Sequence, residues 1–569
     1  MTILGIKLTH DGGLALIDNG KLIFSYEMEK LDNAERHSEF CIDIPKMKEI
    51  LAEYNYNWDE IDQTVIDGWG DNNFEIVIDK LKNIRAKVAE YGRILEKEDN
   101  ILTAKKFEIR EYGLFYKSYK HIASHAVGAY CTSPFAKEEQ DSFILIWDGG
   151  MPPQLLYYQY AENSFLNLGH LFLFSGFIYV DFARSFRPFS NLEGNLSIAG
   201  NLSIAGKVMA YIALGNVNEE VLISFRKIYD NIAALIEYDT VNYRMVEFVT
   251  REFIKQAETL EFQDEVNHED ILASFHAFVQ ELIVGSLGKK IGEYPGYHKN
   301  LCFAGGSALN IKWNSGIRDS GIFQNVWVPP FPNDSGSAIG TACCEMMASD
   351  NIRHLQWNVY SGPVLKDADP VNNGYSVTPC NMEVLAYILH HNDEPIVFLN
   401  GPAELGPRAL GSRSILAPAT NPAMKDLLNK IKARENYRPV APICLEEDAP
   451  DVFYPGFPDP YMLFEHYVKQ QWKDKVPAIC HLDGSARLQT VNQVQNELIY
   501  ELLVFYKKLS GIPLLCNTSA NFNGKGFFPD VKSAMEWGNV NFIWSDSRLY
   551  YKNRSFRPVG SIKEISMSI

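Results

Sequence analysis

Residues 401–414 combine the residue types that bind phosphate groups. The run Gly-Pro-Ala-Glu-Leu-Gly-Pro-Arg-Ala-Leu-Gly-Ser-Arg-Ser follows an apolar segment, 395–399, that predicts a strand. Glycine allows the backbone to approach a ligand closely, and proline excludes a plain helix through the turn. Arg408 and Arg413 lie five residues apart and could converge on one phosphate. A surface loop with solvated arginines is the alternative for such a run in isolation.

Further cationic, amide and hydroxyl side chains come after this turn. They are Lys432, Arg434, Arg438 and Arg487, followed by Asn517, Ser519 and Asn521 after the apolar run 512–516. Together they predict a basic site assembled from several strand ends. The whole chain is acidic, because 53 Lys and Arg stand against 71 Asp and Glu and give a net charge of −18. A basic cluster in an acidic chain favours a small phosphorylated ligand over a nucleic acid.

A second group of residues could bind a metal ion. His121 and His125 lie four residues apart in a helical pattern, so both imidazoles face the same side of the helix. Asp148 and Asp334 stand at the ends of apolar runs and are candidate carboxylate ligands. A ligand set of two histidines and carboxylate suits Fe(II) or Zn(II) and does not decide between them. Two half-buried structural histidines are the alternative.

The elements that must position these residues occur twice. Residues 3–25 have the pattern strand, turn, strand, turn, strand, and residues 142–168 repeat it with an Asp-Gly-Gly turn after the first strand. This repeat resembles the duplicated α/β fold of actin, sugar kinases and related ATPases, in which each such turn faces nucleotide phosphate. Two unrelated hairpins are the alternative.

Apolar spacing predicts helices over 44–54 and 275–291, and residues 80–112 have a mixed-charge, mostly helical pattern. Gly305, Gly306 and Asn310 form a strand, glycine turn and helix start that could hold a nucleotide. A polar stretch over 356–377 predicts the boundary between two domains.

The hexamer Asn-Leu-Ser-Ile-Ala-Gly occurs twice in succession, over 195–200 and 201–206. Six residues rotate a helix by about 1.7 turns. We therefore expect one copy to bulge out as a loop.

The cysteines and apolar runs indicate the compartment. Nine cysteines form no CxxC pair and indicate reduced thiols in a cytoplasmic protein. The first residues do not have the pattern of a signal peptide, and the apolar stretch over 171–180 is too short to span a bilayer. We therefore expect no membrane association.

The order of these motifs resembles the O-carbamoyltransferases of antibiotic tailoring and nodulation-factor modification. The matching segments span essentially the whole chain and comprise His121-xxx-His125-Ala, Asp148-Gly, Gly206-Lys207-Val-Met, Gly305-Gly306-xxx-Asn310, Asp334-Ser-Gly, 404–414, Arg438-Pro-xx-Pro442 and Asn517-Thr-Ser519-x-Asn521. The resemblance implies two α/β domains. Residues 1–355 are similar to the actin-like enzyme that transfers threonylcarbamoyl to tRNA, and residues 356–569 to the YrdC-type domain that makes the acyl-adenylate.

The resemblance also implies the chemistry. The second domain joins carbamoyl phosphate and ATP, with Mg, into carbamoyl-adenylate, and the first passes the carbamoyl group to a small-molecule alcohol. The implied ligands of the carbamoyl and phosphate groups are Glu404, Arg408, Arg413, Lys432, Arg438, Arg487, Asn517, Ser519 and Asn521. Lys432, Arg438 and Arg487 are in addition expected to be catalytic.

For the first domain, the resemblance implies nucleotide binding by Gly206, Lys207, Gly305, Gly306 and Asn310. It implies a divalent metal ion, Fe(II) by family expectation with Zn or Mn as alternatives, on His121, His125, Asp148 and Asp334. His10 sits where a general base could take the acceptor proton; a plain hairpin-turn residue is the alternative.

Two other functions compete with this interpretation. A tRNA-modifying threonylcarbamoyl enzyme would need a basic RNA surface, which the net charge of −18 disfavours. A non-catalytic ATP-binding module with an actin-like fold would leave the cationic residues without a purpose. We expect no nucleic-acid partner, and a homodimer is compatible with the sequence. One departure from the family is Gly524-Lys525-Gly526, where a Gly-Glu-Pro triplet is common.

Overall fold

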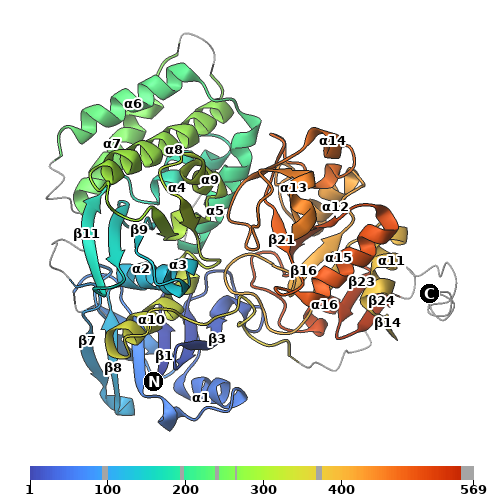
Figure 1. The fold of residues 1–569 in the computed structure, drawn as a ribbon, viewed down its shortest axis with the longest axis horizontal. Coiled ribbons are helices and arrows are strands. Elements are labelled where there is room, and N and C mark those ends of the chain that lie inside the picture. The colour runs from blue at the N-terminus through green and yellow to red at the C-terminus, as the bar shows by residue number, and fades with distance from the viewer. Residues whose placement is uncertain are drawn as a thin grey trace. The chain divides into compact units, whose positions relative to one another are not determined.

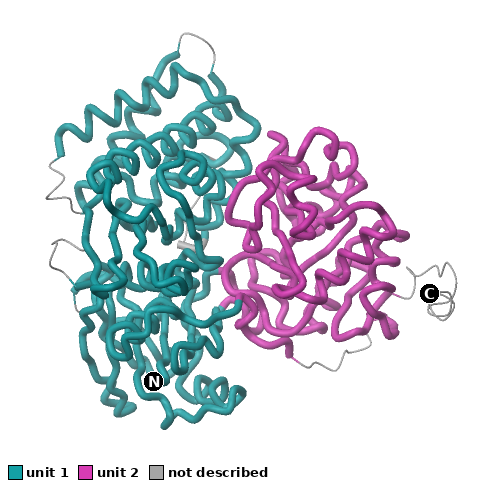
Figure 2. Tube along the Cα trace, viewed as in Figure 1, with its two compact units in different colours: residues 1–28, 37–358 teal, residues 29–36, 359–569 magenta. Residues whose placement is uncertain are grey.

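The computed structural model (Figure 1) describes the chain except for residues 73, 93–99, 192–197, 237–242, 263–265, 367–373 and 553–569. The chain divides into two compact units (Figure 2). Unit 1 comprises residues 1–28 and 37–358, and unit 2 comprises residues 29–36 and 359–569. The division after residue 358 lies three residues from the predicted one, whereas the membership of 29–36 in unit 2 is not anticipated by the sequence.

Unit 1 contains two mixed sheets with the same strand order. The first runs β3-β2-β1-β4-β8-β7 and the second β11-β10-β9-β12-β13. In the first sheet β1, β2 and β3 form an antiparallel meander, and β4 pairs with β1 in parallel. In the second sheet β9, β10 and β11 form the same meander, and β12 pairs with β9 in parallel. The strands are β1 (Thr2–Lys7), β2 (Gly13–Asp18), β3 (Lys21–Glu27), β4 (Gln63–Asp67), β7 (Lys105–Ile109), β8 (Leu114–Tyr119), β9 (Ser142–Ile146), β10 (Gln154–Gln159), β11 (Ser164–His170), β12 (Asn300–Ala304) and β13 (Asn325–Trp327). The duplication predicted from the two hairpins is confirmed.

Two helices of unit 1 pack closely because glycines remove side chains from their contact. Helix α2 (His121–Cys131) packs on β9 and β12, and α10 (Ser337–Ser349) packs on β1, β2 and β4. A Cβ on Gly340 would stand 2.1 Å from the Ser124 carbonyl oxygen, and one on Gly5 would stand 2.2 Å from that of Ala338. These close approaches bring the first turn of α2, the residues before α10 and the end of β1 to one place.

The remaining helices of unit 1 cover its second half. They are α4 (Ile178–Ala183), α5 (Ile198–Tyr211), α6 (Glu219–Ala233), α7 (Tyr243–Glu258), α8 (His268–Gly292) and α9 (Ile311–Asp319), with the short α3 (Pro134–Lys137) after α2 and α1 (Ile44–Glu53) beside the first sheet. The helices predicted at 44–54 and 275–291 are confirmed. The helical prediction for 80–112 is wrong in its described part, which holds β6 (Ile84–Lys87) and β7. In β6 the exposed Arg85 and Lys87 alternate with the buried Ile84 and Ala86, a strand pattern that the high charge obscured.

Helix α8 is long and apolar enough to cross a membrane by length and composition alone, with a mean hydropathy of 1.4. Of its most apolar window, 56% is buried within the protein. Phe275 of α8, for example, stacks on Phe182 of α4 with ring centroids 3.7 Å apart. A core helix passes the same test.

The repeated hexamer does not bulge out in its second copy. Residues 201–206 lie inside α5, which also includes 198–200 of the first copy, while 195–197 fall outside the described residues. The predicted loop is therefore wrong for 201–206. The Ala, Leu, Met and Lys residues of α5 favour a helix, and together they outweigh its two glycines.

Unit 2 is built on an eight-stranded sheet of order β14-β24-β23-β15-β16-β22-β17-β21. Its strands are β14 (Tyr375–Pro379), β15 (Ile396–Leu399), β16 (Arg413–Ala417), β17 (Ala441–Leu445), β21 (Gln489–Val491), β22 (Leu514–Ser519), β23 (Phe542–Ser545) and β24 (Arg548–Lys552). Helices α11 (Met382–Asn392) and α15 (Glu497–Ser510) pack against each other, and α12 (Ala423–Ile431) ends at Lys432. Because β15 leads into β16, and Ser414 pairs with Ser519 on β22, the loop 400–412 and the residues after β22 share one edge of the sheet.

Candidate functional site

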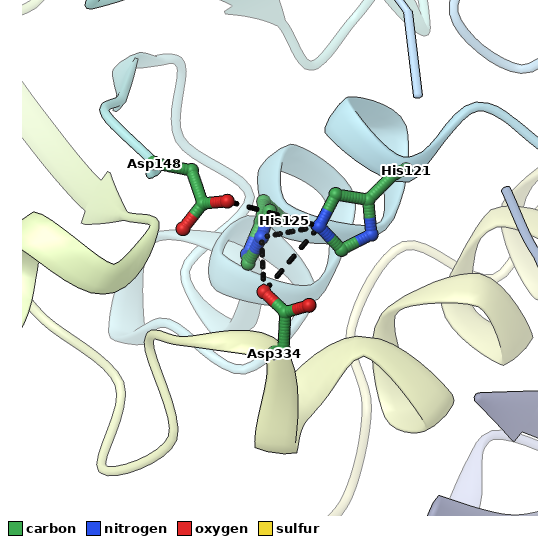
Figure 3. A group of neighbouring side chains, drawn as sticks. All are labelled: His121, His125, Asp148 and Asp334. Atoms are coloured by element: carbon green, nitrogen blue, oxygen red, sulfur yellow. Dashed lines mark hydrogen bonds and ion pairs between the residues drawn. The ribbon is translucent and has the colours of Figure 1, made fainter. Parts of the chain in front are cut away.

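Two histidines and two carboxylates of unit 1 converge at one point. This histidine–carboxylate cluster consists of His121 and His125 on α2, Asp148 after β9 and Asp334 before α10 (Figure 3). The two Nε2 atoms are 3.1 Å apart, and Asp334 Oδ1 lies 3.4 Å from each of them. Asp148 Oδ2 lies 4.0 Å from His121 Nε2. The structure thus brings together all four residues predicted from the sequence.

The ring orientation of His121 is set by a buried carboxylate at the end of β4. Asp67 Oδ2 lies 2.7 Å from His121 Nδ1, and Ser124 donates to Asp67 Oδ1 at 2.6 Å. Burial alone would lower the pKa of His121, but the Asp67 carboxylate raises it to about 9. An Nδ1–H donated to Asp67 leaves Nε2 aimed at the cluster centre, which is the usual arrangement of a metal-binding histidine.

Asp148 is held by two donors. The Gly306 N–H donates to Oδ1 at 2.8 Å, and the hydroxyl of Tyr91 donates to Oδ2. Gly305 has φ +92° and its Cβ would stand 2.4 Å from the Trp147 carbonyl oxygen, so only glycine fits beside the end of β9. The glycine turn therefore positions a carboxylate of the cluster.

Lys7 is the cation nearest to the cluster. Its Nζ lies 2.9 Å from Asp334 Oδ2 and 3.0 Å from Asp67 Oδ2. The burial of Asp334 would raise its pKa, but Lys7, His121 and His10 hold the pKa of this carboxyl well below its ordinary value. Asp334 is thus ionised and turns Oδ1 toward the two histidines.

The cluster fits a divalent transition-metal ion. Bonds of about 2.1 Å to N and O ligands place neighbouring ligand atoms about 3.0 to 3.4 Å apart in octahedral or tetrahedral geometry. The distances among His121, His125 and Asp334 fall in that range, and Asp148 Oδ2 lies just outside it, at 4.0 Å from His121 Nε2. Two neutral imidazoles with two carboxylates are the donor set of Fe(II), Zn(II) and Mn(II) sites.

His10 lies beside this cluster on the turn after β1. Its Nε2 is 3.5 Å from Asp334 Oδ2, and its Nδ1 is 2.9 Å from Asp11 Oδ2. His37 Nδ1 contacts the other Asp11 oxygen at 2.8 Å. Burial would raise the pKa of Asp11, but the two histidines lower it to about 2. Asp11 thus fixes the ring of His10 so that Nε2 faces the centre of the site.

The residues predicted to bind nucleotide in unit 1 fall in two places. Gly305 and Gly306 lie beside Asp148, and the Asn310 side chain caps α9 by accepting the N–H groups of Lys312 and Trp313. Gly206 is on α5 with open space around its Cα, and Lys207 follows it half-buried. No contact places Gly206 next to Gly305 among the described residues.

The loop 400–412 of unit 2 is held rigidly from inside. The buried Glu404 accepts the backbone N–H groups of Leu410, Ser412 and Arg413 on Oε1, at 2.6, 2.8 and 3.1 Å. Arg413 is 1% exposed and donates to the carbonyls of Asn400, Gly401, Ser412 and Pro363. These contacts use Glu404 Oε1 and the two terminal nitrogens of Arg413 within the loop, whereas Glu404 Oε2 is buried without a hydrogen-bond partner among the described residues. That Glu404 and Arg413 bind the carbamoyl or phosphate group stays a prediction.

Arg408 instead joins a cation cluster of unit 2. This cluster consists of Arg36, Arg408, Lys432, Arg434, Arg438 and Arg487. Burial, together with the repulsion from neighbouring cations, lowers the pKa of Arg408 to about 10 and that of Arg434 to about 9. The Nε atoms of Arg434 and Arg487 are buried without a hydrogen-bond partner among the described residues.

Carboxylates stand only at the margin of this cluster in the part of the chain described. Glu435 is 3.8 Å from Arg438, and Glu29 is 4.0 Å from Arg36. Half-buried cations that repel one another and carry unused donors need an anionic ligand. The geometry therefore fits a polyanion such as a phosphate.

The other predicted residues of unit 2 surround these cations. Lys432 Nζ donates to the Ser519 and Asn521 carbonyls and to the Asn521 side chain, and Ser519 Oγ donates to Asn521 Oδ1 at 2.7 Å. Asn517 donates to the Ala409 carbonyl at 2.9 Å and to Gln489 at 2.8 Å. The strand end after β22 is thereby tied both to Lys432 and to the loop that carries Arg408.

Residues 29–36 belong to the same site. The Arg36 N–H donates to the Gly524 carbonyl and the Gly526 N–H to the Ala34 carbonyl, both at 2.9 Å. A Cβ on Gly526 would stand 1.5 Å from the Glu29 carbonyl oxygen, so this position requires glycine. Lys525 forms an ion pair with Glu35. The Gly-Lys-Gly departure from the family triplet is thus matched by an acidic partner on this segment.

Sequence reasoning missed Lys7, Asp67, Tyr91 and Arg36. Lys7 is a charged residue inside the apolar run of β1, and Asp67 ends the apolar run of β4. A buried charge in a strand is a signal that the sequence does contain. Tyr91 and Arg36 lie in irregular segments and carry no comparable signal.

Comparisons with known proteins agree over most of the chain. Family models described as carbamoyltransferase N-terminus and carbamoyltransferase C-terminus match residues 2–343 and 388–543. "Nodulation protein U" of Sinorhizobium fredii is 44% identical over 97% of this chain and 99% of its own length. A "3'-hydroxymethylcephem-O-carbamoyltransferase" of Amycolatopsis lactamdurans is 30% identical over 93% of this chain and 94% of its own length. A glucokinase structure from Streptomyces griseus aligns with 60% of this chain and 98% of its own at 9% identity and a TM-score of 0.26, too low to bear on the fold.

Proposed function

The chain belongs to the carbamoyltransferase family and is an enzyme that transfers carbamoyl groups, and from this premise we propose a two-step O-carbamoylation. Unit 2, as a YrdC-like domain, activates carbamoyl phosphate with ATP as carbamoyl-adenylate. Unit 1, as an actin-like domain, passes the carbamoyl group to a hydroxyl of a small-molecule natural product. The printed names of the relatives, a nodulation protein and a cephem O-carbamoyltransferase, support an alcohol acceptor.

The cation cluster of unit 2 is the observation that carries the activation step. In that step water releases phosphate from carbamoyl phosphate, a carbamate oxygen attacks the α-phosphorus of ATP, and pyrophosphate leaves. Negative charge grows on the phosphoryl oxygens, and preorganised cations lower that barrier. Arg438 and Arg487 supply charge, and Lys432 is held at the end of β22 by Ser519 and Asn521.

The histidine–carboxylate cluster supports the transfer step in unit 1. His121, His125, Asp148 and Asp334 would hold a divalent ion, Fe(II), Zn(II) or Mn(II), which supplies a Lewis acid that polarises the acyl group. His10, oriented by Asp11, accepts the acceptor proton on Nε2. The alcohol oxygen then attacks the carbamoyl carbon and AMP leaves.

A direct assay tests this function. Purified protein is incubated with carbamoyl phosphate, ATP, Mg²⁺ and a panel of sugar, cephem and macrocyclic alcohols, with mass detection of products. We expect AMP, pyrophosphate and a product heavier by one carbamoyl group. Carbamoylation without ATP consumption would overturn the adenylate route, and modification of tRNA but of no alcohol would favour the threonylcarbamoyl alternative.

A further inference from the structure

Lys7 places a buried positive charge between two carboxylates that serve the histidine–carboxylate cluster. Its side chain is 1% exposed, and Nζ lies 2.9 Å from Asp334 Oδ2 and 3.0 Å from Asp67 Oδ2. Nζ is also 3.4 Å from His121 Nδ1 and 4.1 Å from the ring centroid of Trp69. The described residues around Nζ are thus ligands of the cluster, the carboxylate that orients His121, and an aromatic face.

The charged side chains around Lys7 and the histidine–carboxylate cluster sum to a net charge of minus two, so two positive charges are lacking. Asp67, Asp148 and Asp334 carry three negative charges, Lys7 carries one positive charge, and His121 and His125 are neutral as metal ligands. A divalent ion brings this buried group to neutrality. A trivalent ion would leave one excess positive charge, and an uncompensated buried charge is costly.

The next carboxylate out from the cluster is that of Asp11, which lies beyond His10. Its two oxygens are 2.9 Å from His10 Nδ1 and 2.8 Å from His37 Nδ1. His10 touches the cluster through Asp334 at 3.5 Å, whereas Asp11 contacts histidines. The balance at the metal position therefore depends on Lys7 more than on this outer trio.

Lys7 also determines which oxygen of Asp334 is offered to the ion. Oδ2 is taken by Lys7, and Oδ1 faces both histidine Nε2 atoms at 3.4 Å. Ligation through one oxygen leaves room for a further ligand at the ion.

We propose that Lys7 is a positioning and specificity-determining residue that makes the site select a divalent over a trivalent ion and keeps bound iron in the reduced state. This inference rests on the metal part of the proposed function. Removing the ammonium should favour the trivalent state, because an ion about 5 Å away then loses repulsion that scales with its charge. At an effective dielectric constant of about 20, that difference is on the order of a hundredfold in relative affinity.

The test is the midpoint potential of bound iron together with Co(II) affinity, neither of which is an activity. Full-length apoprotein is loaded anaerobically with Fe(II), and a separate sample is titrated with Co(II) by absorption spectroscopy. For Lys7→Met we expect tighter Co(II) binding, because the ammonium no longer repels the cation, and a midpoint potential lower by about 120 mV, which is a hundredfold at about 59 mV per tenfold.

Charge-matched variants separate this role from a general packing effect. Lys7→Met combined with Asp67→Asn restores the deficit of two and should return the midpoint toward that of wild type. Asp67→Asn alone should raise it, and it tests the same balance if Lys7→Met does not fold. Lys117→Met is the matched control. Lys117 pairs at 2.6 Å with the buried Glu345, which lies in the C-terminal half of α10, whereas Asp334 precedes this helix, so the midpoint should stay unchanged.

The outcomes distinguish the two proposals. If wild-type protein binds neither Fe(II) nor Co(II), the metal proposal and this inference fall together. If it binds them, but Lys7→Met leaves the midpoint unchanged or the double variant shifts as far as the single one, only the role of Lys7 is overturned.

Discussion

The two candidate ligand-binding regions of this carbamoyltransferase have opposite charge deficits. The cluster of unit 1 presents carboxylates and neutral imidazoles around one ammonium, so it lacks positive charge. The cluster of unit 2 presents six cations with carboxylates only at its margin, so it lacks negative charge. Because the charged groups are buried or half-buried, their net charge costs free energy until a ligand of opposite charge binds. The sign of each deficit is the reason why we propose a metal ion as the ligand in unit 1 and a phosphorylated substrate as the ligand in unit 2.

The two regions also differ in how they are made rigid. Unit 1 uses regular elements brought together by glycines, such as Gly340 against Ser124 and Gly5 against Ala338. Unit 2 uses an irregular loop whose backbone is held by the side chains of Glu404 and Arg413. A loop of this kind can present several arginines to one anion, whereas helix and strand ends give the fixed spacing that a metal ion requires.

The largest effect is expected from removing one cation of unit 2. Arg487→Met should slow adenylate formation by on the order of a hundredfold or more, because each charged contact to a buried phosphate contributes roughly 2–5 kcal/mol. The same variant should unfold at a higher temperature than wild type without ligand, since it relieves repulsion among Arg408, Arg438 and Arg487. Pyrophosphate release and thermal unfolding measure the two effects.

Arg548→Met is the control for this prediction, because Arg548 is exposed on β24 of the same unit. It should change neither quantity. A less stable Arg487→Met protein would mean that Arg487 has a structural partner and that the cluster is not an open anion site.

The corresponding change in unit 1 is the removal of both histidines. His121→Ala combined with His125→Ala should abolish the binding of about one divalent ion per chain, because two carboxylates alone hold such an ion weakly. Elemental analysis of purified protein measures this directly. Equal metal content in wild type and the double variant would show that the cluster is a structural histidine pair.

A smaller effect is expected from the ion pair that anchors residues 29–36 within unit 2. Lys525→Glu should cost about 0.2–1 kcal/mol, because it places Glu35 beside a like charge at a largely exposed pair. Adding Glu35→Lys should restore stability by reversing the pair. Denaturant unfolding of wild type, Lys525→Glu and the double variant measures the energetic coupling between Lys525 and Glu35. A double variant no more stable than Lys525→Glu would contradict a stabilising ion pair.

The smallest effect is expected from deleting residues 201–206. The two hexamers are identical, so after deletion the same six residues, now 195–200, precede Lys207 and can form the same part of α5. Folding and carbamoylation should stay within about twofold of wild type. A loss of activity above tenfold would show that the length of the segment before α5 matters.

The histidine pair of the cluster and the repeated hairpins of unit 1 could be predicted from the sequence. His121 and His125 are neighbours on one helix, and the Asn-Gly and Asp-Gly-Gly turns indicate hairpins by local chemistry. Local spacing is enough for such features. Reliance on local spacing also explains the error at 80–112, where charge concealed short strands.

Other features depend on contacts far apart in sequence. Arg413 resembles Arg408 in the linear sequence, yet it turns inward because the carbonyls of Asn400 and Pro363 surround it. Arg36 reaches the cation cluster of unit 2 although some 370 residues separate it from Arg408. No local pattern distinguishes a guanidinium that builds a loop from one that binds a ligand.

The central claim is that activation and transfer are separate chemistries of separate units, and crossed half-reaction assays test it most directly. Pyrophosphate release driven by carbamoyl phosphate and ATP is measured for Arg438→Ala and His125→Ala, with acceptor carbamoylation in parallel. The account predicts that Arg438→Ala loses both activities. His125→Ala should keep pyrophosphate release near the wild-type rate and lose carbamoylation. Equal loss of pyrophosphate release in the two variants would contradict the account and indicate one mixed active site.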